Sequence, residues 1–337
     1  MERTSATGVD PLLRVERLGV TIDTDLGPQQ VISDVSFEVA PGETLAIIGE
    51  SGSGKSVAVR AVMGLLPPRR GRITAGRVTF DGVELPARPT RASRRLCGTK
   101  MGMVFQDSLS ALNPVFTVGY QIAELFRVRH GWNRSRAWAA AVEALEHVGI
   151  PDAARRARAY PHEFSGGMRQ RAVIAMAIAL RPRLLIADEP TTALDVTVQA
   201  QIMELLERLR QENGMAMILI SHDLGVVARY ADRVSIMYAG RVVETGPLRE
   251  VYDGPKHPYT RALMQSIPSE AVPGAPLRTI PGLPPSPNAL PSGCAFHPRC
   301  PMARERCTVE RPALRVLEGG QSSACHFAEE VPAYAIR

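Results

Sequence analysis

Short apolar segments separated by turn signals fill the first hundred residues of the chain. Their length and their valine, isoleucine and phenylalanine content predict β-strands. Asp81 and Gly82 interrupt the last segment, and an Asp-Gly pair is typical of a two-residue hairpin turn. We therefore expect a strand-rich region at the start of the chain. The segments are residues 12–22, 35–39, 44–49 and 77–85.

The hydrophobic pattern then changes from strands to helices and back. Residues 120–149 and 166–180 show helical spacing and are rich in alanine, leucine and glutamate. Buried strands alternating with helices return at residues 184–188, 216–221 and 233–240. This order predicts an α/β fold that carries an antiparallel β subdomain and an inserted helical subdomain, at about residues 107–180.

The last part of the chain is rich in proline and cysteine. Ten prolines lie between Pro268 and Pro301, and proline disfavours both helix interiors and central strands. We therefore place a boundary near residue 265. It divides a domain of residues 1–265 from residues 266–337, which comprise a proline-rich linker and a small cysteine-rich C-terminal extension.

Composition places the chain among ordinary globular proteins, with 45% hydrophobic and 22% charged residues. The longest apolar run, residues 172–180, is far shorter than the roughly 20 residues that span a membrane. The N-terminal residues lack the hydrophobic region of a secretory signal, so we expect a cytoplasmic protein. A net charge of +6 is too small to indicate a nucleic-acid partner.

A glycine-rich phosphate-binding motif follows the buried segment 44–48. Its pattern, GxxxxGK[ST] between a strand and a helix, predicts backbone N–H groups that surround phosphate oxygens. Lys55, one of only three lysines in the chain, would reach the β- and γ-phosphates, and the Ser56 hydroxyl would bind magnesium. The motif comprises Gly49, Glu50, Ser51, Gly52, Ser53, Gly54, Lys55 and Ser56.

Polar residues at the ends of later strands complete a candidate ATP-hydrolysing site. Asp188 and Glu189 follow a buried strand, where the first can hold magnesium and the second can orient an attacking water. His222 ends another apolar run, and Gln106 ends the run that begins at Met101. Each is a weak signal alone, but their order after the phosphate-binding motif indicates a nucleotide hydrolase.

The sequence FSGGMRQR, residues 164–171, resembles the signature of ABC transporter nucleotide-binding subunits, and residues 12–265 match that family throughout. The resemblance implies a head-to-tail dimer in which each ATP lies between the Walker motifs of one subunit and the signature of the other. Ser165, Gly166, Gly167 and Asp195 would then serve the nucleotide sites. It also implies that Gln106 joins the magnesium shell and that His222 senses the nucleotide.

Other segments resemble the oligopeptide and dipeptide importer subfamily, which includes nickel importers. They are GESGSGKS, FQDSLSALNPVFTVGYQI, FSGGMRQRAVIAMAIA and KHPYTRAL. The resemblance implies an ATPase that drives peptide import, at the cytoplasmic face of the plasma membrane. Its partners would be a second ATPase subunit, two permease subunits and an extracytoplasmic binding protein. One departure is Ile22, which stands where an aromatic ring normally stacks on adenine.

Four cysteines of the tail suggest a metal, because a proline-rich segment without its own core gains folding energy from ligands. Their spacing is wider than in common zinc modules, and an iron–sulfur cluster, zinc and no metal all remain open from the residues alone. The subfamily resemblance implies a 4Fe-4S cluster. His297 and His326 are alternative ligands, and Cys97 lies apart. The four cysteines are Cys294, Cys300, Cys307 and Cys325.

Two other functions are compatible with parts of this pattern. One is an ABC importer motor for nickel or another solute, because the motor subunit does not reveal what is transported. The other is a soluble ABC ATPase that acts on nucleic acid rather than in transport. The single compact cassette of this chain argues against the second function, because such proteins commonly carry two cassettes or large insertions.

Overall fold

The computed structural model describes residues 10–25, 27–107, 111–192, 194–266 and 279–333. Its contacts divide the chain into two compact units. The first unit combines residues 1–90 with residues 221–337, and the second comprises residues 91–220. In the sequence, the second unit is therefore an insertion in the first.

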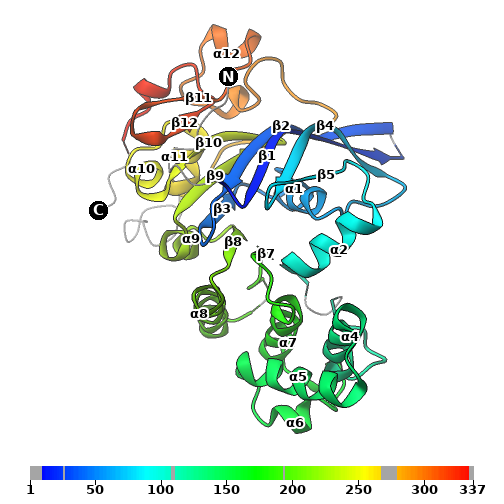
Figure 1. Ribbon diagram of the computed structural model, residues 1–337. Helices are drawn as coiled ribbons and strands as arrows, with labels where there is room; N and C mark the ends of the chain where they lie inside the picture. Colours follow the sequence, from blue (N-terminus) through cyan, green and yellow to red (C-terminus); the bar gives the residue numbers. More distant parts are fainter. Residues whose placement is uncertain (1–9, 26, 108–110, 193, 267–278, 334–337) are drawn as a thin grey trace. The chain divides into compact units, whose positions relative to one another are not determined.

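The first unit contains a four-stranded antiparallel sheet in the order β2-β1-β4-β5 (Figure 1). The predicted hairpin is confirmed: Phe80 pairs with Val83, and Asp81 and Gly82 both have positive φ, of 52° and 75°. Two positive φ values are the conformation that favours Asp-Gly in such turns. The strands are β1 (Leu13–Thr24), β2 (Gly27–Val39), β4 (Gly71–Phe80) and β5 (Val83–Leu85).

A second set of strands in the first unit runs in the order β11-β12-β10-β9-β3. Strand β3 pairs in parallel with β9, β9 pairs antiparallel with β10, and β10 pairs antiparallel with β12. All five residues of β3 are buried. The strands are β3 (Thr44–Ile48), β9 (Arg233–Tyr238), β10 (Arg241–Pro247), β11 (Arg315–Val316) and β12 (Ser322–Ser323).

Short helices complete the first unit. Figure 1 shows the orange and red C-terminal segments beside β10 and α10, in agreement with the β10–β12 pairing. Residues 267–278, where the proline-rich segment begins, lie outside the described residues, and the boundary near residue 265 stays a prediction. The helices are α1 (Lys55–Val62), α9 (Leu224–Tyr230), α10 (Leu248–Asp253), α11 (Pro258–Gln265), η3 (His297–Arg299), α12 (Glu305–Val309), η4 (Glu318–Gly320) and η5 (Ala328–Glu330).

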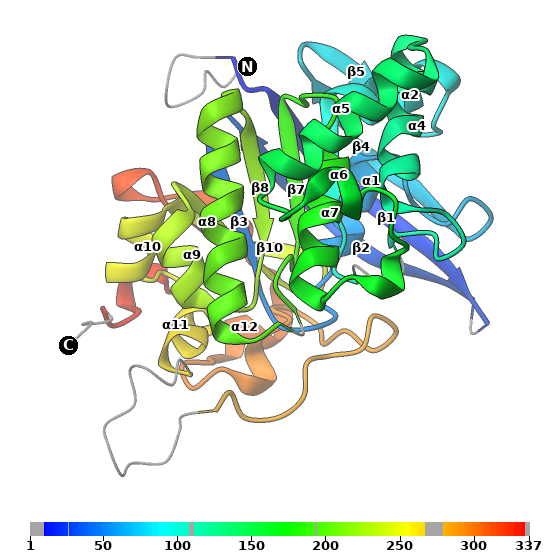
Figure 2. The ribbon, with the colours of Figure 1, turned by 90° about the horizontal axis from the view of Figure 1, so that it is seen from below.

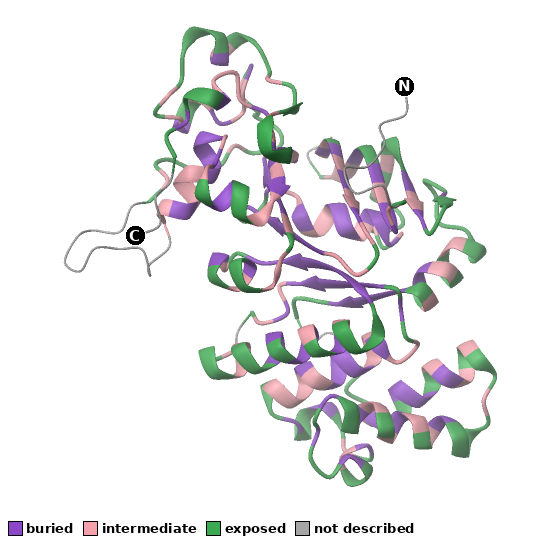
Figure 3. Cartoon of the chain, turned by 60° about the vertical axis from the view of Figure 1, so that its left-hand side comes forward, coloured by how far each residue is buried: buried purple, intermediate pink, exposed green. Residues whose placement is uncertain are grey.

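The second unit contains three parallel strands in the order β8-β7-β6. Every residue of these strands is buried, as the purple strands of Figure 3 show. Strands buried on both faces need continuous apolar sequences, which is what the segments at 184–188 and 216–220 supply. The strands are β6 (Met101–Val104), β7 (Leu184–Asp188) and β8 (Ala216–Ile220).

The described residues of the second unit also form several helices. Helices α4, α5, α6 and α7 contact one another and form the predicted helical block (Figure 2). Among the described residues of the chain, no helix is long and apolar enough to cross a membrane. The helices are α2 (Arg91–Lys100), α4 (Val118–His130), α5 (Arg134–His147), α6 (Ala153–Arg156), η1 (Pro161–Glu163), α7 (Gly166–Ile178) and α8 (Val196–Asn213).

An aromatic cluster binds the C-terminal extension to the core of the first unit. The Phe296 ring lies 5.3 Å from the rings of both Tyr238 in β9 and Tyr259 in α11, and all three side chains are buried. Aromatic rings at this spacing attract one another in addition to the apolar area they bury. The extension therefore shares a core with β9 and α11.

Candidate functional site

The predicted phosphate-binding loop joins β3 to α1 in the first unit. Gly49 has a φ of 150°, and a β-carbon there would lie 2.2 Å from the Met237 carbonyl oxygen. Gly54, in the left-handed region at the N-terminus of α1, has φ 102°, and a β-carbon there would lie 2.5 Å from Ile32 Cδ1. Both ends of the loop therefore require glycine, because no other residue has room or the same backbone freedom.

Polar groups of the loop are arranged around its own backbone. The buried Lys55 ammonium donates to the carbonyl oxygens of Gly49 and Glu50, at 2.8 and 3.1 Å. Ser53 is buried, and its Oγ has no hydrogen-bond partner among the described residues. A buried hydroxyl without a partner is costly unless something else binds it. The loop therefore has polar groups suited to an anionic ligand.

The second unit brings Gln106 and Glu189 together. Gln106 Nε2 donates to Glu189 Oε2 at 3.0 Å, and the Thr192 hydroxyl donates to the same oxygen at 3.1 Å. Glu189 follows the fully buried Asp188 at the end of β7 and has φ 48°. Left-handed backbone is uncommon for glutamate and is found at functional sites that hold it in place. The backbone and two side chains thus fix the Glu189 carboxylate.

Two helices of the second unit begin at the predicted signature and D-loop residues. Ser165 precedes α7 and accepts the Met168 N–H at 3.3 Å, and Asp195 precedes α8 and accepts the Val198 N–H at 2.9 Å. A β-carbon on Gly167 would lie 3.0 Å from Val198 Cγ1, so the first turn of α7 lies against the start of α8. Helix N-termini carry partial positive charge and attract anions.

The remaining predicted nucleotide residues belong to the first unit. His222 is exposed and lies just before α9, whose N-terminus is capped by Asp223. Ile22 lies in β1, between Gln29 of β2 and Gly71 of β4. The structure thus places the phosphate-binding loop and His222 in one unit, and Gln106, Asp188, Glu189, Ser165 and Asp195 in the other. Their roles stay predictions.

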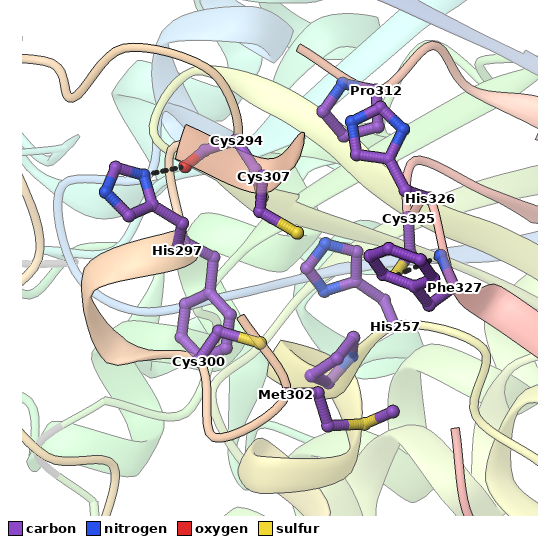
Figure 4. A pocket seen from close by; sticks show the side chains of 12 residues that line it. His257, Cys294, His297, Cys300, Met302, Cys307, Pro312, Cys325, His326 and Phe327 are labelled. Atoms are coloured by element: carbon purple, nitrogen blue, oxygen red, sulfur yellow. Dashed lines mark hydrogen bonds between the residues drawn. The ribbon is translucent and has the colours of Figure 1, made fainter. Parts of the chain in front are cut away.

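A cavity in the first unit is lined by all four cysteines of the tail, together with three histidines. Its volume is about 20 Å³. Figure 4 shows the sulfur atoms of Cys300 and Cys307 directed into this space. Burial, reinforced by the neighbouring thiols, raises the pKa of Cys300 and Cys325 to about 11. These thiols are therefore protonated at neutral pH unless a cation binds them.

The predicted 4Fe-4S cluster is not confirmed. Within the part of the chain that the structure describes, no group of three or more His, Cys, Asp and Glu side chains is positioned to hold a metal ion. The four cysteines are free thiols. The donor set suits a soft metal, and the thiols line one cavity, but they do not converge on a single point.

One contact of the loop was not anticipated from the sequence. Arg299, between Cys294 and Cys300, forms a two-pronged ion pair with Glu50, at 2.7 and 2.9 Å. The two residues are 249 positions apart. Glu50 occupies a variable position of the motif, and Arg299 is one of many arginines, so no local signal connects them.

Comparisons with known proteins agree on the family. The family model described as ABC transporter matches residues 32–192, and the model described as oligopeptide/dipeptide transporter, C-terminal region, matches residues 243–307. The dipeptide transport ATP-binding protein DppD of Escherichia coli (strain K12) is 48% identical over 316 residues, with 94% of this chain and 96% of DppD covered. A putative peptide import ATP-binding protein of Brucella abortus (strain 2308) is 50% identical over 315 residues, with 94% of each covered.

Solved structures share the fold. A dimeric, post-hydrolysis state of the ATP-binding cassette MJ0796 bound to ADP and phosphate is 26% identical, with a TM-score of 0.63. It covers 70% of this chain, and 99% of the cassette is matched. The predicted α/β ABC-type nucleotide-binding fold is thereby confirmed. The DppD protein and the Brucella protein are 48% and 50% identical to this chain over 94% of its length. The chain therefore belongs to the ATP-binding proteins of the oligopeptide/dipeptide family of ABC transporters.

Proposed function

We propose that this chain binds and hydrolyses ATP to drive the import of dipeptides or longer peptides, as the motor subunit of an ABC importer. The observation that carries the proposal is the 48% identity to a dipeptide transport ATP-binding protein over 94% of the chain. The match of residues 243–307 to the C-terminal region of oligopeptide/dipeptide transporters supports the peptide assignment.

The phosphate-binding loop is proposed to hold the ATP phosphates. Lys55 would exchange its two loop carbonyl partners for phosphate oxygens, and the Ser53 hydroxyl would gain a partner. The loop glycines and Ser51 would contribute backbone N–H groups. Magnesium, when bound, would neutralise phosphate charge, and Ser56, Gln106 and Asp188 are its proposed ligands. Asp188 is a suitable carboxylate because it ends β7 fully buried.

Glu189 is proposed as the general base of the hydrolytic step. Its carboxylate would orient the attacking water and accept its proton, which requires an oxygen held in one position. The hydrogen bonds from Gln106 and Thr192 supply that restraint. His222, exposed before α9, would contact the γ-phosphate and report whether it is present. ATP binding and hydrolysis would thereby close and reopen a dimer.

The signature residues are proposed to act on a nucleotide held by a second ATPase subunit. Ser165 and Asp195 cap adjacent helix N-termini, and Gly166, the first residue of α7, is exposed. The dimeric cassette bound to ADP and phosphate supports this arrangement. We propose that the second subunit is a paralogue, which the peptide importer family favours.

An apolar surface in the second unit is the proposed contact with the membrane subunits. Val115 is 69% exposed, and the exposed rings of Phe116 and Tyr120 stack at 5.1 Å. Exposed apolar clusters of this kind commonly mark protein contacts. We propose that two permease subunits cover this surface at the cytoplasmic face of the plasma membrane, and that the complex receives its solute from an extracytoplasmic binding protein.

We propose that the four tail cysteines bind a 4Fe-4S cluster with a structural role, for which their sulfur atoms would have to converge more closely than they do in this structure. Support comes from four free thiols around one cavity and from the thiolate preference of such clusters. Protein purified without oxygen should be brown and contain about four irons per chain. Cys300→Ser should abolish both, whereas Cys97→Ser, a change in α2, should abolish neither. Stoichiometric zinc without iron would contradict this proposal.

The transport assignment is tested with the complex in lipid vesicles. The chain is purified with its partner ATPase, permeases and binding protein, and uptake of a labelled dipeptide, a longer peptide and nickel is measured with and without ATP. We expect peptide uptake that requires ATP and is lost in Glu189→Gln. Uptake of nickel alone would favour the nickel importer alternative. ATP hydrolysis that responds to DNA or RNA and not to the binding protein would favour the nucleic-acid alternative.

A further inference from the structure

Glu50, the second residue of the phosphate-binding loop, has two polar groups that bind residues outside the loop, its side-chain carboxylate and its backbone N–H. Its carboxylate accepts two hydrogen bonds from Arg299, at 2.7 and 2.9 Å. Its backbone N–H donates to the Tyr259 hydroxyl at 2.8 Å. Its carbonyl oxygen accepts from Lys55 and from the Ser53 N–H. The conformation of Glu50 is thus linked directly to that of Lys55.

The Arg299 side chain is buried and is held by several hydrogen bonds. Its side chain is 5% exposed, compared with 24% for the Glu50 side chain. Besides Glu50, the guanidinium donates to the Pro281 carbonyl at 2.8 Å and to the Tyr238 hydroxyl at 3.3 Å. A planar guanidinium can make these bonds simultaneously, whereas a lysine ammonium cannot pair with both carboxylate oxygens in this way.

The position of Arg299 depends on the cysteine cavity. Arg299 ends the short helix η3, which lies between Cys294 and Cys300. The Cys294 N–H donates to the Cys307 carbonyl, and the Cys300 N–H donates to the His297 carbonyl. Phe296 lines the cavity and also packs in the aromatic cluster with Tyr238. The fold of the cavity walls therefore fixes where the guanidinium lies.

The pair also removes a charge problem from the loop. A free carboxylate in a loop that binds a triphosphate repels the ligand, because like charges at short range oppose each other. Pairing with Arg299 neutralises the Glu50 carboxylate and holds it against the extension. Loss of Arg299 would leave this carboxylate charged and without its ion-pair partner.

We propose that Arg299 is a positioning residue of the ATP site, through which the cysteine-rich extension sets the conformation and charge of the phosphate-binding loop. The affinity for ATP then depends on the folded state of the extension. This inference rests on the proposed role of residues 49–56 in nucleotide binding. If the unaltered chain fails to bind ATP, that role fails first, and the result is distinct from a failure of Arg299.

The test uses the full chain. ATP affinity is measured by displacement of a fluorescent ATP analogue in the presence of magnesium, and thermal unfolding is measured separately. Arg299→Gln should weaken ATP binding about 10-fold, which corresponds to about 1.4 kcal/mol. Arg315→Gln is the matched control, because Arg315 makes an ion pair with Glu329 and both side chains are exposed. The control should change ATP affinity less than about 2-fold.

A double-mutant cycle separates positioning from general loss of stability. Glu50→Gln removes the charge that Arg299 neutralises, so Glu50→Gln with Arg299→Gln should bind ATP within about 2-fold of Glu50→Gln alone. Arg299→Lys keeps the positive charge and should bind ATP with an affinity between those of the unaltered chain and Arg299→Gln. This variant tests the proposal if Arg299→Gln unfolds the extension. The proposal is overturned if Arg299→Gln binds ATP as tightly as Arg315→Gln. It is also overturned if the losses of ATP affinity in Glu50→Gln and Arg299→Gln add in the double variant.

Discussion

The loop glycines Gly49 and Gly52 test whether close contact with β9 sets the position of the phosphate-binding loop. Both have positive φ, of 150° and 79°. A β-carbon on Gly49 would lie 2.2 Å from the Met237 carbonyl oxygen, whereas a β-carbon on Gly52 would meet nothing within 4 Å. Alanine adds one methyl group at either position. The two variants therefore differ only in the backbone conformation at the site and in what the added methyl group meets.

The expected cost of Gly49→Ala follows from this contact. Carbon and oxygen atoms in proteins rarely approach closer than about 3.3 Å, so the loop must move by about 1 Å away from β9. The backbone strain adds about 1–3 kcal/mol. Displacements of about 1 Å in reacting groups reduce rates about 100-fold, and Lys55 shares a hydrogen bond with the displaced Gly49 carbonyl. Gly52→Ala should cost only about 1 kcal/mol.

The assay compares ATP turnover and thermal unfolding of the two variants in the assembled transporter and in the full chain, respectively. We expect Gly49→Ala to lose about 100-fold in turnover and to unfold several degrees below Gly52→Ala. Turnover of Gly49→Ala equal to that of Gly52→Ala would refute the claim that the contact with Met237 sets the loop position.

Two further predictions concern charge. Glu189→Gln should lower ATP turnover at least about 100-fold while ATP binding persists, because the amide keeps the shape but cannot accept a proton; Glu212→Gln, in an exposed ion pair, is the control, and retention of more than about half the turnover would contradict the assignment. Burial of Glu244 raises the pKa of its carboxyl to about 7, so its contribution to stability is present below its unfolded pKa of about 4.5 and is lost as pH rises through 7. The free energy of unfolding, measured in urea, should fall by about 3 kcal/mol between pH 5 and 8, and Glu244→Gln should remove most of this pH dependence. The same pH dependence in Glu244→Gln would show that Glu244 is not its cause.

The parts of the site that the sequence predicts well are those in which one segment contains both the signal and its structural context. Residues 44–56 contain the buried strand, the glycines that need positive φ, and the start of α1. The Asp-Gly turn at residue 81 is local in the same sense. Gln106 and Glu189 are 83 positions apart, but both follow strands of one parallel set, so the order of strands indicates their proximity.

The ion pair of Glu50 with Arg299 is different, because charge alone does not select partners. The chain has 40 basic and 34 acidic residues, and each arginine has many possible carboxylates. The partner of Glu50 is fixed by the packing of Phe296 and by the walls of the cysteine cavity. Such tertiary packing leaves no periodic pattern in the sequence. A prediction that treats residues 266–337 as a separate extension therefore does not reveal the ion pair.

The pairing of β12 with β10 also bears on the solubility of the protein. Ser322 and Ser323 pair with Thr245 and Glu244, and the Ala324 N–H donates to the Val243 carbonyl at 2.8 Å. Strands with open edges pair readily with other chains and aggregate. A protein cut after residue 265 would expose the backbone groups of Val243, Glu244 and Thr245 that now pair with the tail. By pairing with β10, the short final strands protect part of its edge, so we expect the full chain to aggregate less than a protein cut after residue 265.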